Sequence, residues 1–363
     1  MNILWFAWKD IRHPAAGGAE TVADTMAKLL VGDGHSVIFL SSNFPGGKHK
    51  EHINGYSVIR VGRKFTVYLF AAFYYLRHLR AWPNIVIEEI NTMPFFTRFY
   101  VFKKKKVLIF QLCREIWFHE FVTPLSYVGY FLEPVYMSLL RGMPFITESK
   151  STKRDLLGYG FNKNDVSIFP IGVALPKRED NSVQKFTTFT LLSIGSIRSM
   201  KQTDHQIKAF ELAKKNIPKL RLYISGKPNG TYGAQVLSMI KSSPYAKDIT
   251  YLGYISNVRR AELMKKAHCL LVTSVKEGWG LIVTEAGVQG TPSIVYDVDG
   301  LRDVVNFGKA GYMTKENTPE SLAKSIIYVY KNYRKLDFKK LKQWHSQFTY
   351  EKSYATFKKL LFS

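Results

Sequence analysis

Residues 1–42 constrain the fold more than any other part of this sequence. Residues 1–8 are a continuous apolar run, which is typical of a strand buried on both faces of a parallel sheet. A glycine-containing loop, AAGGAE, comes next, and residues 21–34 then repeat apolar side chains at helical spacing before two glycines. Residues 35–42 are a second apolar run. A strand, a helix and a strand in this order predict a right-handed βαβ unit.

The same alternation of strands and helices continues along the chain and starts again after a polar stretch at residues 174–187. We therefore predict an α/β protein with two doubly wound, Rossmann-like domains that face each other across a cleft. The first domain spans residues 1–173, residues 174–187 form the linker, and residues 188–344 form the second domain. The amphipathic C-terminal segment, residues 345–363, is expected to pack back on the first domain as a helix.

The net charge of +24 narrows the classes of partner. A field of this sign attracts nucleic acid, anionic membranes or phosphorylated small molecules. The sequence contains no helix-turn-helix, zinc-binding or RNP-type motif, so we expect no nucleic-acid partner.

The cysteines and the N-terminus indicate a cytoplasmic location. Cys113 and Cys269 are far apart, each in an apolar setting, and we expect both to be buried thiols in a reducing compartment. The N-terminal segment lacks the basic region and the cleavage site of a secretory signal.

The segment at residues 62–82 has an apolar body flanked by cations and allows two interpretations. It is either a buried helix of the first domain, or a surface that lies on the anionic inner face of the membrane and reaches a lipid-linked acceptor. Its apolar core is well short of the roughly 20 residues that a transmembrane helix needs.

The stretch EGWGLIVTE, residues 277–285, follows an apolar strand and carries the chemistry of the second domain. Gly280 allows a sharp turn, and we expect a helix from Leu281 to Gln289. The backbone N–H groups of Gly280, Leu281 and Ile282 then form an anion site suited to a diphosphate. Glu277 and Glu285 are carboxylates that can each accept hydrogen bonds from vicinal hydroxyls of a sugar.

This stretch resembles the E-x7-E region of retaining glycosyltransferases of family 4, which have the GT-B fold. Trp279 stands at the usual Phe position, and Asp299 stands at the first glycine of the closing Gly-Gly. Three further segments resemble the family in order: the glycine loop with Gly17 and Gly18, the turn IFPIGV, and the donor-phosphate segment, residues 191–210.

The resemblance implies roles for particular residues. Lys201 matches the lysine that binds the donor diphosphate, and Glu277 matches the catalytic glutamate that contacts the transferred sugar. Glu285 matches the residue that binds the ribose. Ser196 stands where the family has arginine, so we expect Arg198, two residues further on, to supply the guanidinium.

The first domain departs from the family pattern near the reacting sugar. Many members carry a His-Asp pair after the fourth strand, and this chain has Phe110, Gln111 and Leu112 there. The neighbouring acceptor-side candidates are Arg114, Glu115 and His119.

The sequence as a whole predicts a retaining hexosyltransferase that uses a UDP- or GDP-sugar as donor substrate and needs no cofactor and no metal. The expected acceptor is a saccharide or a lipid-linked glycan in surface polysaccharide biosynthesis. Two alternatives stay open: a sugar-nucleotide epimerase on the same fold, and a basic nucleic-acid- or membrane-binding protein with a degenerate site.

Overall fold

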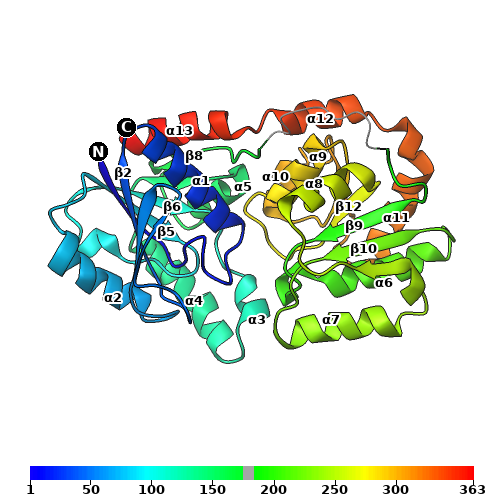
Figure 1. Cartoon of the computed structure of the whole chain (residues 1–363), viewed down its shortest axis with the longest axis horizontal. Coiled ribbons are helices and arrows are strands. Elements are labelled where there is room, and N and C mark those ends of the chain that lie inside the picture. Colours follow the sequence, from blue (N-terminus) through cyan, green and yellow to red (C-terminus); the bar gives the residue numbers. More distant parts are fainter. Residues whose placement is uncertain (175–183) are drawn as a thin grey trace. The chain divides into compact units, whose positions relative to one another are not determined.

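The computed structural model describes residues 1–174 and 184–363, and these form two compact units. The first unit comprises Met1–Trp117, Thr123–Ile171 and Tyr350–Ser363, and the second comprises Phe118–Val122 and Gly172–Thr349. Residues 175–183 of the predicted linker lie outside the described residues. Figure 1 shows the two units and their elements.

The first unit is built on one twisted sheet. Among residues 1–174, eight strands form this sheet in the order β3-β4-β2-β1-β5-β6-β7-β8, and every pair is parallel except β3 with β4. The strands are β1 (Asn2–Phe6), β2 (Ser36–Ser41), β3 (Lys50–Ile53), β4 (Tyr56–Arg60), β5 (Ile85–Ile90), β6 (Lys104–Ile109), β7 (Phe145–Thr147) and β8 (Val166–Ile168).

Helices cover this sheet on both faces, as the buried parallel strands require. They are α1 (Gly18–Gly32), α2 (Val67–Tyr74) with the π-helical turn η1 (Tyr75–Leu79), α4 (Leu125–Ser138), α5 (Lys150–Gly158) and α13 (Tyr350–Phe362), with short 3₁₀ turns η2 (Thr97–Phe99) and η3 (Lys163–Asp165). The short helix α3 (Ile116–Glu120) is divided between the units, since its residues from Phe118 onward group with the second unit. The C-terminal helix α13 runs beside α1 in Figure 1, and Tyr354 donates a hydrogen bond to Asp33 at the end of α1 over 2.5 Å. Phe357 of α13 stacks on Trp5 of β1.

The second unit repeats the architecture with a smaller sheet. Within residues 184–363, six parallel strands follow the order β11-β10-β9-β12-β13-β14. They are β9 (Thr190–Ile194), β10 (Arg221–Ser225), β11 (Ile249–Tyr251), β12 (Cys269–Val272), β13 (Ser293–Val295) and β14 (Tyr312–Met313).

The helices of the second unit alternate with these strands. They are α6 (Thr203–Lys214), α7 (Gly230–Ser242), α8 (Asn257–Lys266), α9 (Leu281–Val288), α10 (Asp299–Val304), α11 (Pro319–Asn332) and α12 (Phe338–Ser346), with 3₁₀ turns η4 (Ser199–Lys201), η5 (Ala246–Asp248) and η6 (Tyr333–Lys335). Thr318 caps α11 through its side chain, and Pro319 is the first helical residue, a combination typical of helix starts.

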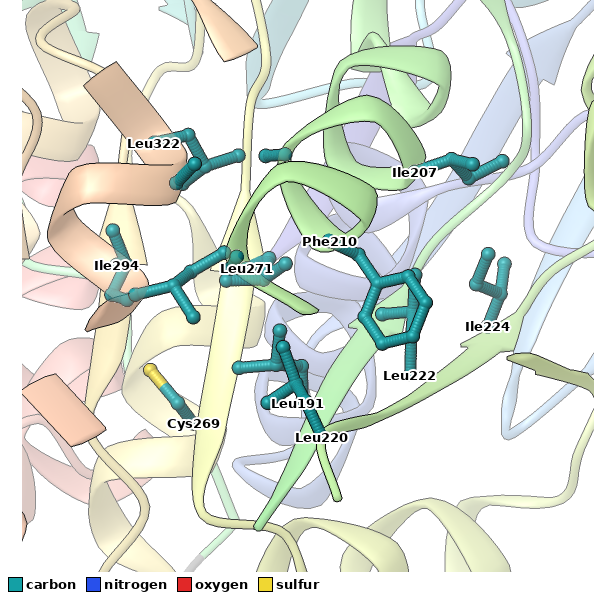
Figure 2. Close-up of a cluster of buried hydrophobic side chains, with 14 of the residues drawn as sticks. Leu191, Ile207, Phe210, Leu220, Leu222, Ile224, Cys269, Leu271, Ile294 and Leu322 are labelled. Atoms are coloured by element: carbon teal, nitrogen blue, oxygen red, sulfur yellow. The ribbon is translucent and has the colours of Figure 1, made fainter. Parts of the chain in front are cut away.

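One core cluster joins the sheet of the second unit to its helices. Figure 2 shows Leu191, Leu222 and Leu271, from the three neighbouring strands β9, β10 and β12, around Phe210 of α6. Cys269 belongs to this cluster. Cys113 is buried as well, and neither cysteine forms a disulfide, so the prediction of two buried thiols is confirmed. A rigid core of this kind fixes the ends of the strands, where the candidate site lies.

Two features of the first unit bear on the sequence analysis. Of the two interpretations of residues 62–82, a fully buried helix is wrong, because α2 buries Val67 and Ala71 but leaves Leu69 and Phe73 exposed. The strand pair β3–β4 was not predicted, although Asn54 and Gly55 between the strands both have positive φ, as a hairpin turn demands. No helix in the described part of the chain is both long and apolar enough to span a bilayer.

Candidate active site

The centre of the candidate site is the loop that leaves β12. Thr273, the first residue after the strand, donates its hydroxyl to the backbone carbonyl of Lys201 over 2.8 Å and accepts a hydrogen bond from Gln206. Val275 N–H donates to the carbonyl of Met200 over 2.9 Å. These bonds join the loop to the 3₁₀ turn η4, and they bring together two segments that are more than 70 residues apart in sequence.

Lys201 and Glu277 meet as a consequence. The Lys201 ammonium group forms an ion pair with Glu277 Oε1, and Ser274 Oγ donates to the same oxygen over 2.7 Å. The two side chains are 26% and 16% exposed, so the pair is mostly shielded but still reachable. Sequence reasoning proposed both residues, and the structure brings them into contact.

The Glu277 carboxyl is held in its charged form. Burial raises its pKa, but the charge of Lys201, the hydrogen bonds from Lys201 and Ser274, and the charge of Arg198 outweigh burial, so the pKa lies below its ordinary value. Glu277 is therefore an anionic hydrogen-bond acceptor at neutral pH. Ser274 is a site residue that the sequence analysis missed, although its position three residues before Glu277 on the same loop was visible.

Helix α9 begins directly after this loop. Gly280 caps it with φ of +90°, a left-handed conformation that favours glycine. The helix runs from Leu281 to Val288, within one residue of the predicted end. The N–H groups of its first turn are free of helical partners and carry the positive end of the helix dipole.

Glu285 lies on the same helix, and only one of its two carboxylate oxygens has a partner among the described residues. Arg260 of α8 contacts Glu285 Oε1 at 3.1 Å, whereas Oε2 is buried and has no hydrogen-bond partner in the part of the chain that the structure describes. Burial raises the pKa of Glu285, and the charge of Arg260 opposes this without cancelling it. An unsatisfied buried oxygen of this kind is costly unless a ligand supplies its partner.

A glycine on α10 fixes the backbone of the loop. Gly300 N–H donates to the carbonyl of Glu277 over 3.0 Å. A Cβ at position 300 would lie 2.4 Å from that carbonyl oxygen and from the backbone of Gly278, far inside contact distance. Glycine at this position therefore permits the close approach that positions Glu277.

The two departures from the motif lie beside this contact. Trp279 is buried in the core, donates its indole N–H to Thr284 over 3.0 Å and packs edge-on against Phe348. Asp299 pairs with Arg302 at 3.0 Å and lies 3.4 Å from Lys276. Trp279 therefore stabilises the start of α9 by packing in the core, and Asp299 stabilises the start of α10 through ion pairs.

Arg198 precedes η4 and keeps part of its guanidinium available. Its NH1 lies 3.7 Å from Glu120, and its buried Nε has no hydrogen-bond partner among the described residues. His119, in the short segment that groups with the second unit, shares a hydrogen bond with Ser199 Oγ over 3.1 Å. Burial lowers the pKa of His119, which favours the neutral imidazole.

In the first unit, Gly17 and Gly18 form the start of α1. Gly17 N–H donates to Glu20 Oε2 over 2.6 Å, and Lys9 contacts the other oxygen of Glu20 at 3.1 Å. Glu20 stands at the third helical position, where a capping acid is expected, so the sequence held a signal for it. Glu89, fully buried on β5, accepts hydrogen bonds from Trp5 and Asn91.

The acceptor-side candidates in the first unit differ in setting. The Arg114 guanidinium stacks on Tyr130 at 4.1 Å and donates to its hydroxyl over 2.8 Å, while Glu115 is exposed. Buried Glu133 of α4 accepts from the backbone N–H groups of Cys113 and Arg114, each over 2.6 Å. Glu133 organises this turn, and no sequence pattern around it predicts that role.

The chemistry of the second-unit site follows from these contacts. It offers cations from the segment around η4 and the N-terminus of α9 to an anion, and the carboxylate oxygens of Glu277 and Glu285 to hydroxyl groups. Within residues 1–174 and 184–363, no group of three His, Cys, Asp or Glu side chains is placed to hold a metal ion.

Solved structures define the class of fold. Sucrose-phosphate synthase from Thermosynechococcus elongatus superposes with a TM-score of 0.78 at 16% identity, over 99% of this chain and 98% of the other. Anabaena Alr3699/HepE, solved with UDP and glucose, superposes with a TM-score of 0.74 at 15% identity, over 99% of each chain. The protein is thus of the two-domain α/β class known as GT-B.

Two family models together cover almost the whole chain. The model described as Glycosyltransferase Family 4 matches residues 16–176, and the model described as Glycosyl transferases group 1 matches residues 177–347. The chain therefore belongs to the family 4-type glycosyltransferases.

Curated relatives share between 22% and 33% of their residues with this chain over the matched segments. A poly(glycerol-phosphate) alpha-glucosyltransferase of Bacillus subtilis is 33% identical over 38% of this chain, and the match spans only 20% of that protein's length. Among the first relatives found, the matched share of their length ranges from 20% to 88%.

Proposed function

We propose that the protein is a retaining hexosyltransferase that moves a sugar from a nucleoside-diphosphate donor to a saccharide or lipid-linked acceptor in surface-glycan synthesis. UDP-hexoses are the first donors to test and GDP-hexoses the second. Similarity to the Bacillus glucosyltransferase and to the Anabaena structure with UDP and glucose supports this order.

One observation carries the proposal: Lys201 of η4 pairs with Glu277 on the loop that leads directly into α9, and Glu285 on that helix keeps a buried oxygen unsatisfied. Only a ligand with an anionic centre and hydroxyl groups on both sides of it uses all three features. A nucleoside-diphosphate sugar has that pattern, because the diphosphate separates the hexose from the ribose.

The diphosphate would bind to Lys201, Arg198 and the N–H groups of Gly280, Leu281 and Ile282. These groups stabilise the negative charge that grows on the leaving diphosphate, which is the main electrostatic contribution expected in such a transfer. A fixed helix dipole and a bidentate guanidinium provide this without reorganisation.

The two glutamates would hold the sugars. Ionised Glu277 accepts hydrogen bonds from hexose hydroxyls and offsets positive charge at the reacting carbon, and Ser274 fixes the orientation of the carboxylate. Glu285 Oε2 accepts from a ribose hydroxyl and gains the partner that it lacks. Retention of configuration is proposed from the family alone.

The test is nucleotide release from a panel of UDP- and GDP-hexoses, with and without glycan acceptors. We expect release that depends on an acceptor, and a loss of about 100-fold or more in Glu277→Gln. Glu262→Gln is the matched control, since Glu262 forms only exposed pairs on α8 and should keep wild-type activity.

The alternatives give different results in the same experiment. An epimerase would isomerise or hydrolyse the donor without an acceptor. A binding protein with a degenerate site would release no nucleotide from any donor, and that outcome would refute the proposal.

A further inference from the structure

Two helices of the first unit expose apolar side chains to solvent in continuous stripes. On α2 and η1 the exposed fraction reaches 74% for Leu69 and 62% for Phe73, and on α4 it reaches 67% for Phe131. The outward stripes comprise Leu69, Phe70, Phe73 and Leu76 on α2–η1, and Val128, Phe131, Leu132, Val135 and Leu139 on α4. Patches of this kind on a monomer mark an interaction site.

The inward sides of both helices pack on one face of the sheet. Tyr75 of η1 packs in the cluster with Leu4 and Val86, whereas Met137 of α4 packs in the cluster with Val107. In the strand register Leu4 pairs with Val86, and Glu88, two residues further on β5, pairs with Val107, so these side chains share a face. The exposed stripes of α2 and α4 therefore both point away from the same side of the sheet.

The loop between β5 and β6 links the two helices. Tyr68 of α2 packs against Phe95 at 4.8 Å, and Tyr136 of α4 donates its hydroxyl to the carbonyl of Thr92 over 2.6 Å. The two stripes are thus parts of one apolar surface, which we define as the nine side chains given above together with Phe102, 81% exposed on the same loop.

Cations border this apolar surface. Arg77, Arg80 and Lys103 are exposed, and the sequence has no Asp or Glu in residues 62–87 or 90–114. A pocket of about 380 Å³ lies at this border, lined by Tyr75, Arg80, Ala81, Phe102 and Lys103. Its two cations and its aromatic walls suit the phosphate and the glycerol portion of an anionic lipid headgroup.

We propose that the apolar surface inserts into the interface of an anionic lipid bilayer, with the pocket at Arg80 and Lys103 holding a lipid phosphate. The charge pattern favours a bilayer over a second copy of the chain. A two-fold interface would place the patch against itself and bring like charges together, because residues 62–87 and 90–114 hold no acid to pair with the cations and Glu133 of α4 is buried. Anionic lipids supply the missing charge and accept bulky apolar side chains.

This surface adds a lipid partner to the proposed function. It also explains how the protein would reach a lipid-linked acceptor, and this explanation alone rests on the proposed transfer activity. Binding to vesicles needs neither donor nor acceptor. Its failure is therefore separate from failure of the proposed reaction.

The experiment is co-sedimentation of the full chain with vesicles of phosphatidylcholine alone or mixed with phosphatidylglycerol, at low and high salt. We expect binding to the mixed vesicles that weakens with salt, and little binding to phosphatidylcholine. Phe73→Ser with Phe131→Ser should lower the partition coefficient about 100-fold. Arg80→Gln with Lys103→Gln should lower it roughly 30-fold on the mixed vesicles only.

A matched control separates this surface from the general effect of removing exposed apolar side chains. Val258→Ser with Tyr328→Ser removes side chains that are 81% and 58% exposed in the second unit, and should bind like wild type. Melting temperatures of all variants check that each is folded.

Three outcomes would overturn the proposal. They are a wild-type chain that stays in the supernatant with mixed vesicles at low salt, a Phe73/Phe131 variant that sediments like wild type, and a wild-type dimer that this variant converts to monomer. The third outcome would assign the surface to contacts between copies.

Discussion

Replacing Gly300 by alanine tests whether the backbone contact between α10 and the loop after β12 positions Glu277, the proposed catalytic carboxylate. Gly300 has no positive φ and lies in a helix, so alanine suits its conformation and only the added methyl group matters. That Cβ would lie 2.4 Å from Glu277 O, whereas ordinary contacts begin at 3.4 Å, so the loop or the helix must shift by about 1 Å.

The expected magnitudes follow from this shift. Overpacking of this kind costs about 1–3 kcal/mol, which lowers the melting temperature by roughly 2–12 °C for a domain of this size. A displacement of about 1 Å at a reacting group costs on the order of 100-fold in rate. We expect kcat to fall more than the donor affinity, since the cations proposed to bind the diphosphate, Lys201 and Arg198, lie on another segment.

The assay is acceptor-dependent nucleotide release, with kcat and KM resolved, beside a thermal melt. Gly32→Ala is the control, because Gly32 also lies in a helix and a Cβ there would meet nothing within 4 Å. If Gly300→Ala keeps its melting temperature and a kcat within about twofold of wild type, the contact does not position Glu277 and the reasoning fails.

Three further predictions concern single charges. Lys201→Met should raise the pKa of Glu277, because it removes the charge that most stabilises the ionised carboxylate. It should also weaken the binding of a nucleoside diphosphate about 10- to 100-fold, measured by calorimetry. Unchanged affinity would exclude Lys201 from the anion site. Glu285→Gln should weaken nucleotide binding by a similar factor but raise the melting temperature at pH 7. The reason is that burial raises the pKa of Glu285, so ionising this carboxyl in the folded protein lowers stability as the pH rises. A variant with lower stability and intact nucleotide binding would contradict the role of Glu285 as a ligand-binding residue. Burial, followed by the charge of Glu20, raises the pKa of Glu89 to about 8, so the free energy of unfolding falls as the pH rises from 4.5 to 8. Glu89→Gln should remove this pH dependence and stabilise the fold by about 3 kcal/mol at pH 7 in denaturant titrations. A variant with the wild-type pH dependence would show that Glu89 is ionised in the fold.

Sequence reasoning succeeded where local signals and strand order act together. The helix α9 follows from a buried strand, a glycine turn and an apolar period, and its observed start at Leu281 matches the prediction. Lys201 and Glu277 are each proposed as site residues through the family resemblance, but their direct contact is not predicted, because parallel strands bring their carboxyl ends to one edge without fixing which side chains touch.

The failures have different physical causes. Glu133 acquires its role from N–H groups about 20 residues earlier, which only the tertiary fold brings to it. The segment containing α2 is apolar on all sides, and such a helix is normally assigned to a core. The outward face of α2 is exposed because nothing in the described chain packs over Leu69 and Phe73. The spacing of apolar residues in the sequence does not predict this exposure.

The ion pair between Lys201 and Glu277 affects which anions can bind at this site. A chain with a net charge of +24 meets many cellular polyanions, and a bare lysine in a shielded site would hold any phosphate. Here a competing anion must first separate the lysine from its glutamate, and inorganic phosphate would leave that carboxylate desolvated without a donor. A nucleotide sugar compensates both partners at once, through its diphosphate and its hydroxyl groups. If the proposed donor binds here, the ion pair therefore favours ligands that carry both a phosphate and hydroxyl groups over those that carry a phosphate alone.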